Sequence, residues 1–397
     1  MKILYILNST FATGGATKSL LCLIDGMRKR GEYAHVVVPD EEGVCTTLQD
    51  WHIPYTVLNY RPSTYPFHRN IKEWLLFLPR LIARRFLERR ATQALQQLIK
   101  KEHFDIVHTN VSVVGIGFKA AQKAHTPHVY HFREYADLDF NTYYYPSSRR
   151  FHNMVKYEGS YTISITQGIA RHHGLDNYSR GKVIYNGIMD EPRALQPIWG
   201  DYLLYAGRLE HTKGILDIIT AYATSKVKMP LYLAGAETEP TTSQKIRAVI
   251  ANHGIGKQVV FLGERTDVRQ LMHNARATLI ASHQEAFGRS MPEAMAESCL
   301  CIANDTAGTK EQLDLGAQLT GEEIALRYHD IDELAQLISQ VATATPESFL
   351  PYIQRALQTV NAKYTVASYV QHIHDFYEEI VSNSYPRPNN GQSHIFN

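Results

Sequence analysis

The chain has 397 residues, a length that at about 100–200 residues per domain favours two domains and excludes a single small one. Its 44% hydrophobic and 20% charged residues are typical of a globular protein and exclude a disordered or fibrous one. The 41 Lys and Arg against 39 Asp and Glu leave a formal charge of +2, so the overall charge gives no reason to expect nucleic acid as a partner.

The cysteines and the N-terminus indicate a cytoplasmic protein. There are four cysteines, too few and wrongly spaced for a disulfide framework or a zinc site: Cys22, Cys45, Cys299 and Cys301. The opening seven residues carry one basic residue and too short an apolar run for a signal peptide, so they predict a buried strand. No stretch reaches about 18 uninterrupted apolar residues, and we expect no membrane span.

Short apolar runs alternate with longer helical patterns through the first half of the chain. The runs predict strands at Ile3–Leu7, Ala34–Val38, Tyr55–Leu58, Phe104–His108, His128–Phe132, Tyr161–Ile165 and Val183–Tyr185. Helical patterns lie between them, for instance at Ala16–Arg30 and Ser112–His125. Strands that are apolar on both faces and alternate with helices are typical of a parallel sheet covered on both sides. Residues 1–188 are therefore predicted to form a doubly wound α/β domain.

The alternation lapses around Met189–Gly200, a turn-rich stretch typical of an interdomain linker, and then restarts. Further strands are predicted at Tyr202–Ala206, Pro230–Ala234, Gln258–Leu262, Ala277–Ala281 and Leu300–Asn304. Residues 189–365 are thus predicted to form a second α/β domain, followed by a helix over 366–384 that packs back on the N-terminal domain and a mobile tail over 385–397. Two such domains side by side predict a deep cleft, with ligands beyond the carboxyl ends of the strands.

A glycine pair, Gly14-Gly15, follows the first strand and leads into a helix. Adjacent glycines let backbone amides approach a ligand, and a helix start favours an anion. The stretch is not a Walker phosphate loop, because Thr17 stands where that motif needs a glycine before its Lys-Ser pair. An ordinary strand-to-helix turn and a loop for ligand approach both stay open on these residues alone.

Two further motifs are set aside because of where they lie. Gly115 and Gly117 match a dinucleotide fingerprint but come too far after the preceding strand, so we predict that they serve close helix packing and exclude a nicotinamide oxidoreductase. The triplets at 137–139 and 330–332 match a metal-holding Asp-x-Asp, but neither follows an apolar strand. We predict turns or helix starts there and expect no metal or other cofactor.

The first strand of the second domain runs into a basic loop with Arg208 and Lys213. Without a metal, the charge of a diphosphate must be met by a guanidinium, an ammonium and backbone amides, and this loop before a helix offers all three. An ordinary basic loop is the alternative reading.

An acidic loop follows the Ala277–Ala281 strand. Glu285 lies on the loop and Glu293 on the first turns of the next helix, where the helix start favours an anion. Each carboxylate can accept two hydrogen bonds from a vicinal diol. One of the two carboxylates would then hold a diol of a sugar ring, and the other a diol of a ribose. Exposed amides at Gly288–Ser290 would reach a phosphate.

Together these motifs resemble glycosyltransferase family 4, in the right order along nearly the whole chain. The residues that carry the resemblance are Gly14-Gly15, Asn186-Gly187, Gly207-Arg208-Leu209, Lys213-Gly214, and Glu285 and Glu293 with Phe287-Gly288 between them. The resemblance implies the GT-B fold, two doubly wound Rossmann-like α/β domains that face a deep cleft. It also implies metal-independent transfer of a sugar from a nucleotide-sugar donor, a UDP- or GDP-sugar, with retention of configuration.

The resemblance further implies roles for individual residues. Arg208 and Lys213 would bind the donor diphosphate, Glu285 the transferred sugar and Glu293 the ribose. The rest of the implied donor site is Gly14, Gly15, Phe287, Gly288 and Arg289. The stretch Thr306–Glu311 matches the family's glycine-rich donor loop, with Ala307 where a second glycine is usual.

His131, at the end of a predicted strand, matches the family's active-site histidine, so the implied catalytic set is His131, Glu285, Arg208 and Lys213. Many relatives have Asp beside this histidine; here Arg133 and Glu134 follow instead, and their roles stay open. For the acceptor we expect aromatic hydroxyls, which suit sugar faces, although the same rings equally suit a core. The acceptor candidates are Arg133, Glu134, Tyr135, Tyr143 and Tyr144.

The helical pattern over Arg69–Lys101 has a local charge of +7 and many apolar residues between its basic ones. A basic amphipathic helix of this kind fits an anionic membrane surface, and the alternative is a core helix with solvated arginines.

The sequence therefore predicts a retaining, metal-independent glycosyltransferase, of the hexosyl- or acetylhexosaminyl-transferase type, that acts on a glycan or polyprenyl-linked acceptor. We expect it to build a bacterial-type cell-surface polysaccharide at the inner face of the plasma membrane. The alternatives are a nucleotide-sugar epimerase of similar fold and a non-catalytic sugar-binding subunit.

Overall fold

A computed structural model describes residues 1–11, 14–66, 71–145 and 147–384. The predicted tail over 385–397 lies outside the described residues. The chain divides into two compact units. Unit 1 comprises Met1–Ile165, Ile169–Ile184 and the chain from Tyr369 onward, and unit 2 comprises Thr166–Gly168 and Tyr185–Ser368.

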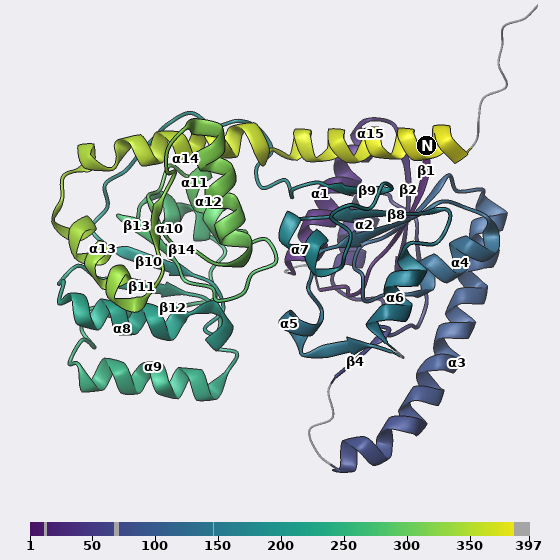
Figure 1. The fold of residues 1–397 in the computed structure, drawn as a ribbon, viewed down its shortest axis with the longest axis horizontal. Coiled ribbons are helices and arrows are strands. Elements are labelled where there is room, and N and C mark those ends of the chain that lie inside the picture. The colour runs from purple at the N-terminus through teal and green to yellow at the C-terminus, as the bar shows by residue number, and fades with distance from the viewer. Residues whose placement is uncertain (12–13, 67–70, 146, 385–397) are drawn as a thin grey trace, which may run out of the picture. The chain divides into compact units, whose positions relative to one another are not determined.

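Unit 1 contains a parallel sheet in the strand order β3-β2-β1-β5-β6-β8-β9, of which β1, β2, β8 and β9 are labelled in Figure 1. Its strands are β1 (Lys2–Ile6), β2 (Tyr33–Val38), β3 (Tyr55–Val57), β5 (Ile106–Thr109), β6 (His128–Phe132), β8 (Ser160–Ser164) and β9 (Gly181–Val183). The short strands β4 (Thr64–Pro66) and β7 (Thr142–Tyr144) pair antiparallel beside it. Residues 3–6 of β1, at the centre of the sheet, are wholly buried, as a strand covered on both faces requires.

The helices of unit 1 connect these strands. They are α1 (Gly15–Lys29), α2 (Val44–Asp50), α3 (Ile71–Glu102), α4 (Ile116–Ala124), α5 (Asp137–Phe140), α6 (Ser148–Val155) and, from Ile169, α7 (Gln167–His172). The C-terminal helix α15 (Val366–Ser384) belongs to unit 1 from Tyr369. It packs against α1 at Gly26, where a Cβ would lie 2.4 Å from Val370 Cγ2, so a side chain at position 26 would force the two helices apart.

Unit 2 contains a second parallel sheet, in the order β12-β11-β10-β13-β14-β15. Its strands are β10 (Leu203–Ala206), β11 (Leu231–Ala234), β12 (Val259–Gly263), β13 (Ala277–Ile280), β14 (Cys301–Asn304) and β15 (Leu326–Tyr328). Its helices are η1 (His211–Lys213), α8 (Ile215–Ser225), α9 (Pro240–Asn252), α10 (Val268–His273), α11 (Ser290–Ala296), α12 (Ala307–Thr320), α13 (Ile331–Thr343), η2 (Pro346–Ser348) and α14 (Leu350–Lys363). A core of buried aliphatic and aromatic side chains from the strands, α8 and α13 holds the layers together.

These two sheets confirm the predicted fold class of two doubly wound α/β domains. In each sheet the strand order reverses at the first strand, which has the second strand of its unit on one side and a later strand on the other. Loops that follow the two strands at such a reversal diverge, and ligands bind in the crevice that opens between them. In unit 2 the reversal lies between β10 and β13.

The two motifs set aside in the sequence have structural roles. Gly117 lies inside α4, and a Cβ there would be 2.2 Å from Thr109 Oγ1 and 2.7 Å from Ile6 Cδ1, so the prediction of close helix packing is confirmed. Asp137 begins α5, and Asp330 caps α13 by accepting a hydrogen bond from the Glu333 amide at 2.8 Å. Both Asp-x-Asp triplets therefore begin helices, as predicted.

Candidate functional site

The basic and acidic loops of unit 2 follow the two strands at which the sheet reverses. Arg208 and Lys213 come after β10, and Glu285 comes after β13. Lys213 Nζ lies 2.6 Å from Glu285 Oε2, and both side chains are partly buried. The structure thus joins two of the predicted site residues in one ion pair, at the crevice where such sheets bind ligands.

Glycine geometry fixes the two loops against each other. Gly214 has φ +66°, and a Cβ there would lie 1.9 Å from the Ala281 carbonyl oxygen, so no other residue fits at the start of α8. One loop also donates to the other, because the His283 amide is 3.0 Å from the Thr212 carbonyl oxygen. Lys213, next to Gly214, is held where β13 ends.

Arg208 does not reach Glu285 in this structure. Its side chain is 61% exposed and its Nη1 lies 2.8 Å from Glu210 Oε1. Because the Arg208 end of this pair is exposed, the pair contributes little stability, and the guanidinium is available to a diphosphate at small cost.

The rest of the acidic loop contains one buried aromatic side chain and one ion pair. Phe287 is buried and packs edge-on against Tyr364 at 5.7 Å, so its side chain anchors the loop instead of facing a ligand. Gly288 has φ +80°, a conformation that favours glycine. Arg289 Nη2 lies 3.1 Å from Glu293 Oε1, one helical turn along.

The Thr306–Glu311 stretch packs directly on the acidic loop. The Gly308 amide donates to the Glu285 carbonyl oxygen at 2.9 Å, and a Cβ at Gly308 would lie 2.7 Å from that same oxygen. The Gln312 side chain donates to the Phe287 and Gly288 carbonyl oxygens, a contact the sequence analysis missed. Ala307, which replaces the usual second glycine, has φ +45°, so it holds the left-handed conformation that glycine adopts without strain.

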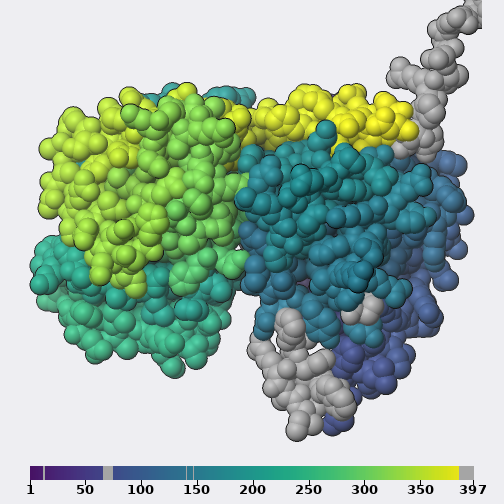
Figure 2. Space-filling model, in the orientation of Figure 1, coloured from purple at the N-terminus to yellow at the C-terminus, as the bar shows by residue number. Residues whose placement is uncertain are grey.

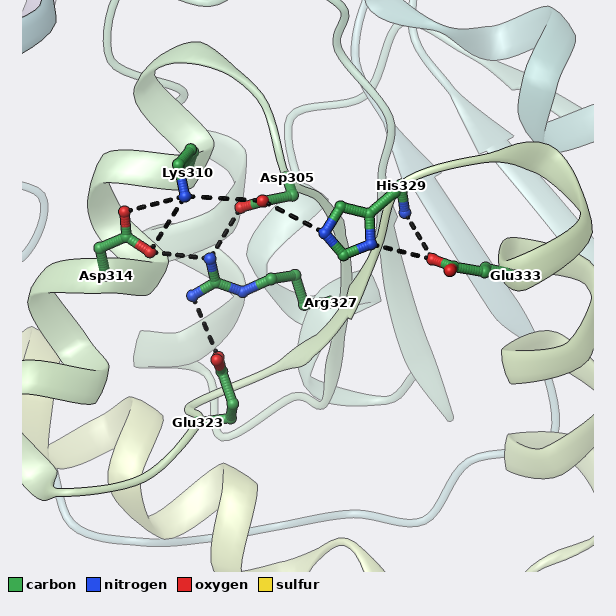
Figure 3. Close-up of polar contacts among 7 residues, drawn as sticks. All are labelled: Asp305, Lys310, Asp314, Glu323, Arg327, His329 and Glu333. Carbon is green, nitrogen blue, oxygen red and sulfur yellow. Dashed lines mark hydrogen bonds and ion pairs between the residues drawn. The ribbon is translucent and has the colours of Figure 1, made fainter.

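A network of seven ionisable side chains fixes the start of this stretch (Figure 3). Arg327 on β15 donates to Asp305 at 2.8 Å and to Asp314 at 2.7 Å. Lys310 lies 3.1 Å from Asp314, and His329 lies 3.4 Å from Asp305. The remaining members, Glu323 and Glu333, pair with Arg327 and His329. Each of the four carboxylates lies beside Arg327, Lys310 or His329, so we assign the network to support of the loop.

In unit 1, His131 ends up wholly buried near the carboxyl end of β6. Its Nδ1 lies 3.2 Å from His108 Nε2 and 3.2 Å from Arg133 Nη2. Among the described residues, its Nε2 has no hydrogen-bond partner. Burial, with the Arg133 charge beside it, holds the pKa of His131 well below its usual range, so the ring is neutral.

Further residues complete this buried cluster. Arg133 Nε donates to Asn110 Oδ1 at 2.8 Å, and Nη2 donates to the Tyr369 hydroxyl at 2.8 Å. His108 Nδ1 is 2.6 Å from the Tyr377 hydroxyl. These partners are not predicted by any motif in the sequence. The one available signal was the spacing of Tyr369 and Tyr377, which eight residues apart lie near one face of a helix.

The acceptor candidates are mostly interior. Glu134 is buried, and its Oε1 accepts hydrogen bonds from the Ser112 amide at 2.7 Å and the Ser112 hydroxyl at 2.6 Å. Burial outweighs these bonds and raises its pKa to about 7. Tyr135 is buried, and Tyr144 stacks on Phe151 at 3.8 Å, so that face of the Tyr144 ring is closed to a sugar.

One acceptor candidate differs in burial. Tyr143 is partly exposed on β7, and its ring lies 6.4 Å from that of Tyr65. Among the predicted aromatic acceptor residues, the Tyr143 side chain is the one that is exposed enough to contact a bound glycan.

Gly14 caps α1 and, like Gly15, is exposed. Gly14 has φ −65°, and a Cβ there would meet the Phe11 carbonyl oxygen at an ordinary 3.5 Å. The packing of unit 1 therefore does not require glycine at position 14, unlike at Gly117. This favours the ligand-approach reading of the glycine pair over an ordinary turn.

The helix α3 lies on the surface of unit 1 (Figure 2). Leu75, Leu78, Ile82 and Phe86 are each between 58% and 63% exposed. Their spacing of three or four residues places them on one helix face. In the part of the chain that the structure describes, no helix has both the length and the apolar character needed to span a bilayer.

The basic residues of α3 differ in their surroundings. Arg80, Arg89 and Arg90 are exposed. Arg84 instead donates to the Thr64 carbonyl oxygen at 3.1 Å, and Arg85 pairs with Glu88 at 3.0 Å. Arg69, at the start of the predicted helix, lies outside the described residues.

Two family models match the chain one after the other. The model described as "Glycosyltransferase Family 4" matches residues 13–191, and the model described as "Glycosyl transferases group 1" matches residues 200–348.

Curated relatives match over a shorter segment. A glycogen synthase of Mycobacterium tuberculosis is 31% identical over 144 residues, which cover 35% of this chain and 33% of that protein. An N-acetyl-alpha-D-glucosaminyl L-malate synthase of Bacillus anthracis is 29% identical over 116 residues, 29% of this chain and 30% of that protein. The chain thus spans about a third of the length of the curated relatives it matches.

Among solved structures, Anabaena HepE in complex with UDP superposes with a TM-score of 0.76 at 22% identity, covering 96% of this chain and 100% of that one. The same protein in complex with UDP-glucose gives a TM-score of 0.74 at 21% identity, with the same coverage. These likenesses agree with the fold predicted from the sequence.

Proposed function

Because the chain belongs to glycosyltransferase family 4, we propose that it transfers a sugar from a nucleotide-sugar donor to a glycan or lipid-linked acceptor, with retention of configuration and without a metal. The observation that carries the proposal is the pairing of Lys213 with Glu285 across the loops that follow β10 and β13. A cation for a diphosphate and a carboxylate for sugar hydroxyls stand side by side there.

In this proposal the cations of unit 2 stabilise the leaving group. As the glycosidic bond breaks, negative charge develops on the nucleoside diphosphate, and Lys213 and Arg208 compensate it without a metal. Glu285 accepts hydrogen bonds from hydroxyls of the transferred sugar. Glu293, now paired with Arg289 at 3.1 Å, accepts them from the ribose.

Unit 1 supplies the remaining groups of the proposal. Gly14 and Gly15 let the loop after β1 approach the donor, and His131 lies near the reacting sugar. Tyr143, Arg133 and Glu134 belong to the acceptor side. The exposure of Gly14 and Tyr143 supports these roles.

For the donor we propose a UDP-sugar first, with a GDP-sugar as the second choice. The support is the likeness to HepE, which was solved in complex with UDP-glucose. For the acceptor we propose a glycan carried on a polyprenyl lipid, in the synthesis of a cell-surface polysaccharide at the cytoplasmic face of the plasma membrane. The support is the exposed apolar face of α3 with its exposed arginines, a combination that suits anionic lipid.

A donor panel tests the proposal. UDP-glucose, UDP-galactose, UDP-N-acetylglucosamine and GDP-mannose are each added to the full chain, and thermal unfolding is followed with and without EDTA. A donor at 100 times its dissociation constant adds about 2.7 kcal/mol of stability, which raises the melting temperature by a few degrees. We expect one donor to do so in the parent, EDTA to leave the shift unchanged, and Lys213→Ala to lose it. No shift with any donor would overturn the proposal.

Turnover of the donor that binds then separates the alternatives. Transfer to an added glycan acceptor supports the transferase. Conversion of the donor to an epimer without acceptor identifies an epimerase, and binding without any turnover identifies a sugar-binding subunit.

A further inference from the structure

A chain of buried hydrogen bonds leads from the C-terminal helix to His131, all within unit 1. The Tyr377 hydroxyl on α15 lies 2.6 Å from His108 Nδ1. His108 Nε2 lies 3.2 Å from His131 Nδ1, and Arg133 Nη2 lies 3.2 Å from the same atom. Tyr377, His108 and His131 are wholly buried, so no solvent competes for these bonds.

The guanidinium determines where the protons lie. Arg133 carries only donors, so His131 Nδ1 must accept, and the proton of the neutral ring must lie on Nε2. His108 Nε2 also faces this acceptor and therefore donates to it. His108 Nδ1 is then unprotonated and accepts from the Tyr377 hydroxyl. Burial beside Arg133 also lowers the pKa of both histidines, in agreement with neutral rings.

This assignment leaves one donor unused. His131 Nε2–H is buried and has no partner among the described residues. Buried donors are almost always satisfied in native proteins, because an unpaired one is costly. His131 is also the penultimate residue of β6, near the carboxyl edge of the sheet, where ligands of such folds bind. An oxygen of a bound ligand would satisfy the donor.

We propose that Tyr377 is a positioning residue for His131: through His108 it holds the ring in the Nε2–H tautomer, so that the ring donates a hydrogen bond to a hydroxyl oxygen of the bound sugar. His131 is then a fixed neutral donor and not a base, because Nε2 holds its proton and Nδ1 is occupied by Arg133. The ligand part of this inference rests on the proposed function; the tautomer part does not.

Nitrogen NMR of histidine-labelled full-length protein tests the tautomers without any substrate. His108→Gln and His131→Gln identify the two signals. We expect both rings to be protonated on Nε2 and unprotonated on Nδ1 at neutral pH. In Tyr377→Phe, the Nδ1 signal of His108 should shift because its donor is lost. A His131 ring that is protonated on Nδ1, or on both nitrogens, overturns the inference, as does an unchanged His108 signal in Tyr377→Phe.

Kinetics with the nucleotide sugar test the positioning role. We expect Tyr377→Phe to lower kcat/KM about tenfold. The matched control is Tyr222→Phe in unit 2, which removes another buried hydroxyl, one that donates to the Met229 carbonyl oxygen at 2.6 Å, and should leave kcat/KM unchanged. Equal values for both variants overturn the positioning role. A parent that turns over no nucleotide sugar but has both predicted tautomers refutes the proposed function instead.

Discussion

Lys213 and Glu285 form an ion pair of 2.6 Å between two loops of unit 2, with 23% and 22% of their side chains exposed. A diphosphate bound at this loop would compete with the Glu285 carboxylate for the Lys213 ammonium. The two residues therefore have opposite effects on nucleotide binding.

We predict that Lys213→Ala weakens binding of UDP by about tenfold or more, the loss of one charge-assisted hydrogen bond. Glu285→Gln should bind UDP at least as tightly as the parent, since it frees Lys213, yet lower turnover by about a hundredfold because it loses contact with the reacting sugar. Calorimetric titration and donor turnover measure these effects. Lys245→Ala, an exposed lysine on α9, is the control. Glu285→Gln with near-parental turnover would remove this residue from the site.

Gly14 and Gly308 respond differently to an added methyl group. At Gly14 a Cβ fits, with its nearest atom at 3.5 Å, so Gly14→Ala should change the free energy of unfolding by less than about 0.5 kcal/mol while lowering kcat/KM for the donor. At Gly308 a Cβ would lie 2.7 Å from the Glu285 carbonyl oxygen, so Gly308→Ala should destabilise unit 2 by about 1–3 kcal/mol. Denaturant unfolding and steady-state kinetics separate the two effects. Unchanged kinetics in Gly14→Ala would favour the ordinary-turn reading.

Ala307 holds φ +45°, a conformation that costs a residue with a Cβ about 1–2 kcal/mol. Glycine relieves this strain but gains entropy in the unfolded chain, worth about 0.4–1 kcal/mol. We predict that Ala307→Gly stabilises the protein by up to about 1 kcal/mol. The control is Ala317→Gly in the last turn of the same helix, which should destabilise by up to about 1 kcal/mol. If both variants lose the same stability in urea, Ala307 is not strained.

All strands of the two parallel sheets except β15 were predicted, because each overlaps a run of apolar residues between turns, and their ends moved by one or two residues. The sequence did not predict β15, whose three residues include Arg327, or the β4–β7 pair, which lies outside the alternating pattern. Length alone is not the reason, because β3 and β9 are equally short and were predicted from the apolar runs that they overlap.

The site was predictable where motifs lie within one loop, as for the loops that hold Lys213 and Glu285. It was not predictable where partners come from distant segments. The contact of Tyr377 with His108 joins residues far apart in the sequence, and only the packing of α15 brings them together. The burial of Tyr144 against Phe151 was likewise invisible, since rings in a core and rings on a surface have the same composition.

Glu134 makes the stability of unit 1 depend on pH. Its pKa is raised by burial from an ordinary value of 4.5 to about 7, so the folded state favours the neutral acid. The unfolded chain therefore releases this proton first as the pH rises, and the contribution of Glu134 to stability falls between about pH 4.5 and 7.

Glu134→Gln keeps the neutral shape and an oxygen for the Ser112 donors. We predict that the free energy of unfolding of this variant, relative to the parent, rises by about 2 kcal/mol between pH 5 and pH 8. The buried histidines have lowered pKa values and act in the opposite direction, but they are present in both proteins and cancel in the difference. Urea unfolding of the variant and the parent at pH 5 and pH 8 measures the difference in their free energies of unfolding. A difference independent of pH would mean that Glu134 is ionised in the folded protein at both values.

The exposed face of α3 carries the apolar side chains of Leu78, Ile82 and Phe86. The exposed arginines Arg89 and Arg90 follow them along the helix. Apolar side chains of this kind bury themselves at the boundary between headgroups and acyl chains, and each basic residue near an anionic surface adds about 1 kcal/mol of attraction. The full chain should therefore sediment with vesicles that contain anionic lipid and much less with neutral ones. High salt should weaken the association, since the attraction is screened over about 10 Å at 0.1 M.

The decisive variant changes only exposed arginines of α3, of which Arg90 lies over the Phe86 ring of the same helix at 5.6 Å. Arg84 and Arg85 contact Thr64 and Glu88, so their replacement would confuse lost binding with lost packing. The three exposed arginines of α3 are Arg80, Arg89 and Arg90. We therefore expect that changing all three to Glu releases the protein from anionic vesicles. A charge-matched control changes three exposed lysines of unit 2 to Glu and should still sediment: Lys228, Lys245 and Lys257. If both triple variants sediment like the parent at low salt, or if both are released alike, α3 does not bind the membrane. Its arginines are then solvated charges on a helix of unit 1.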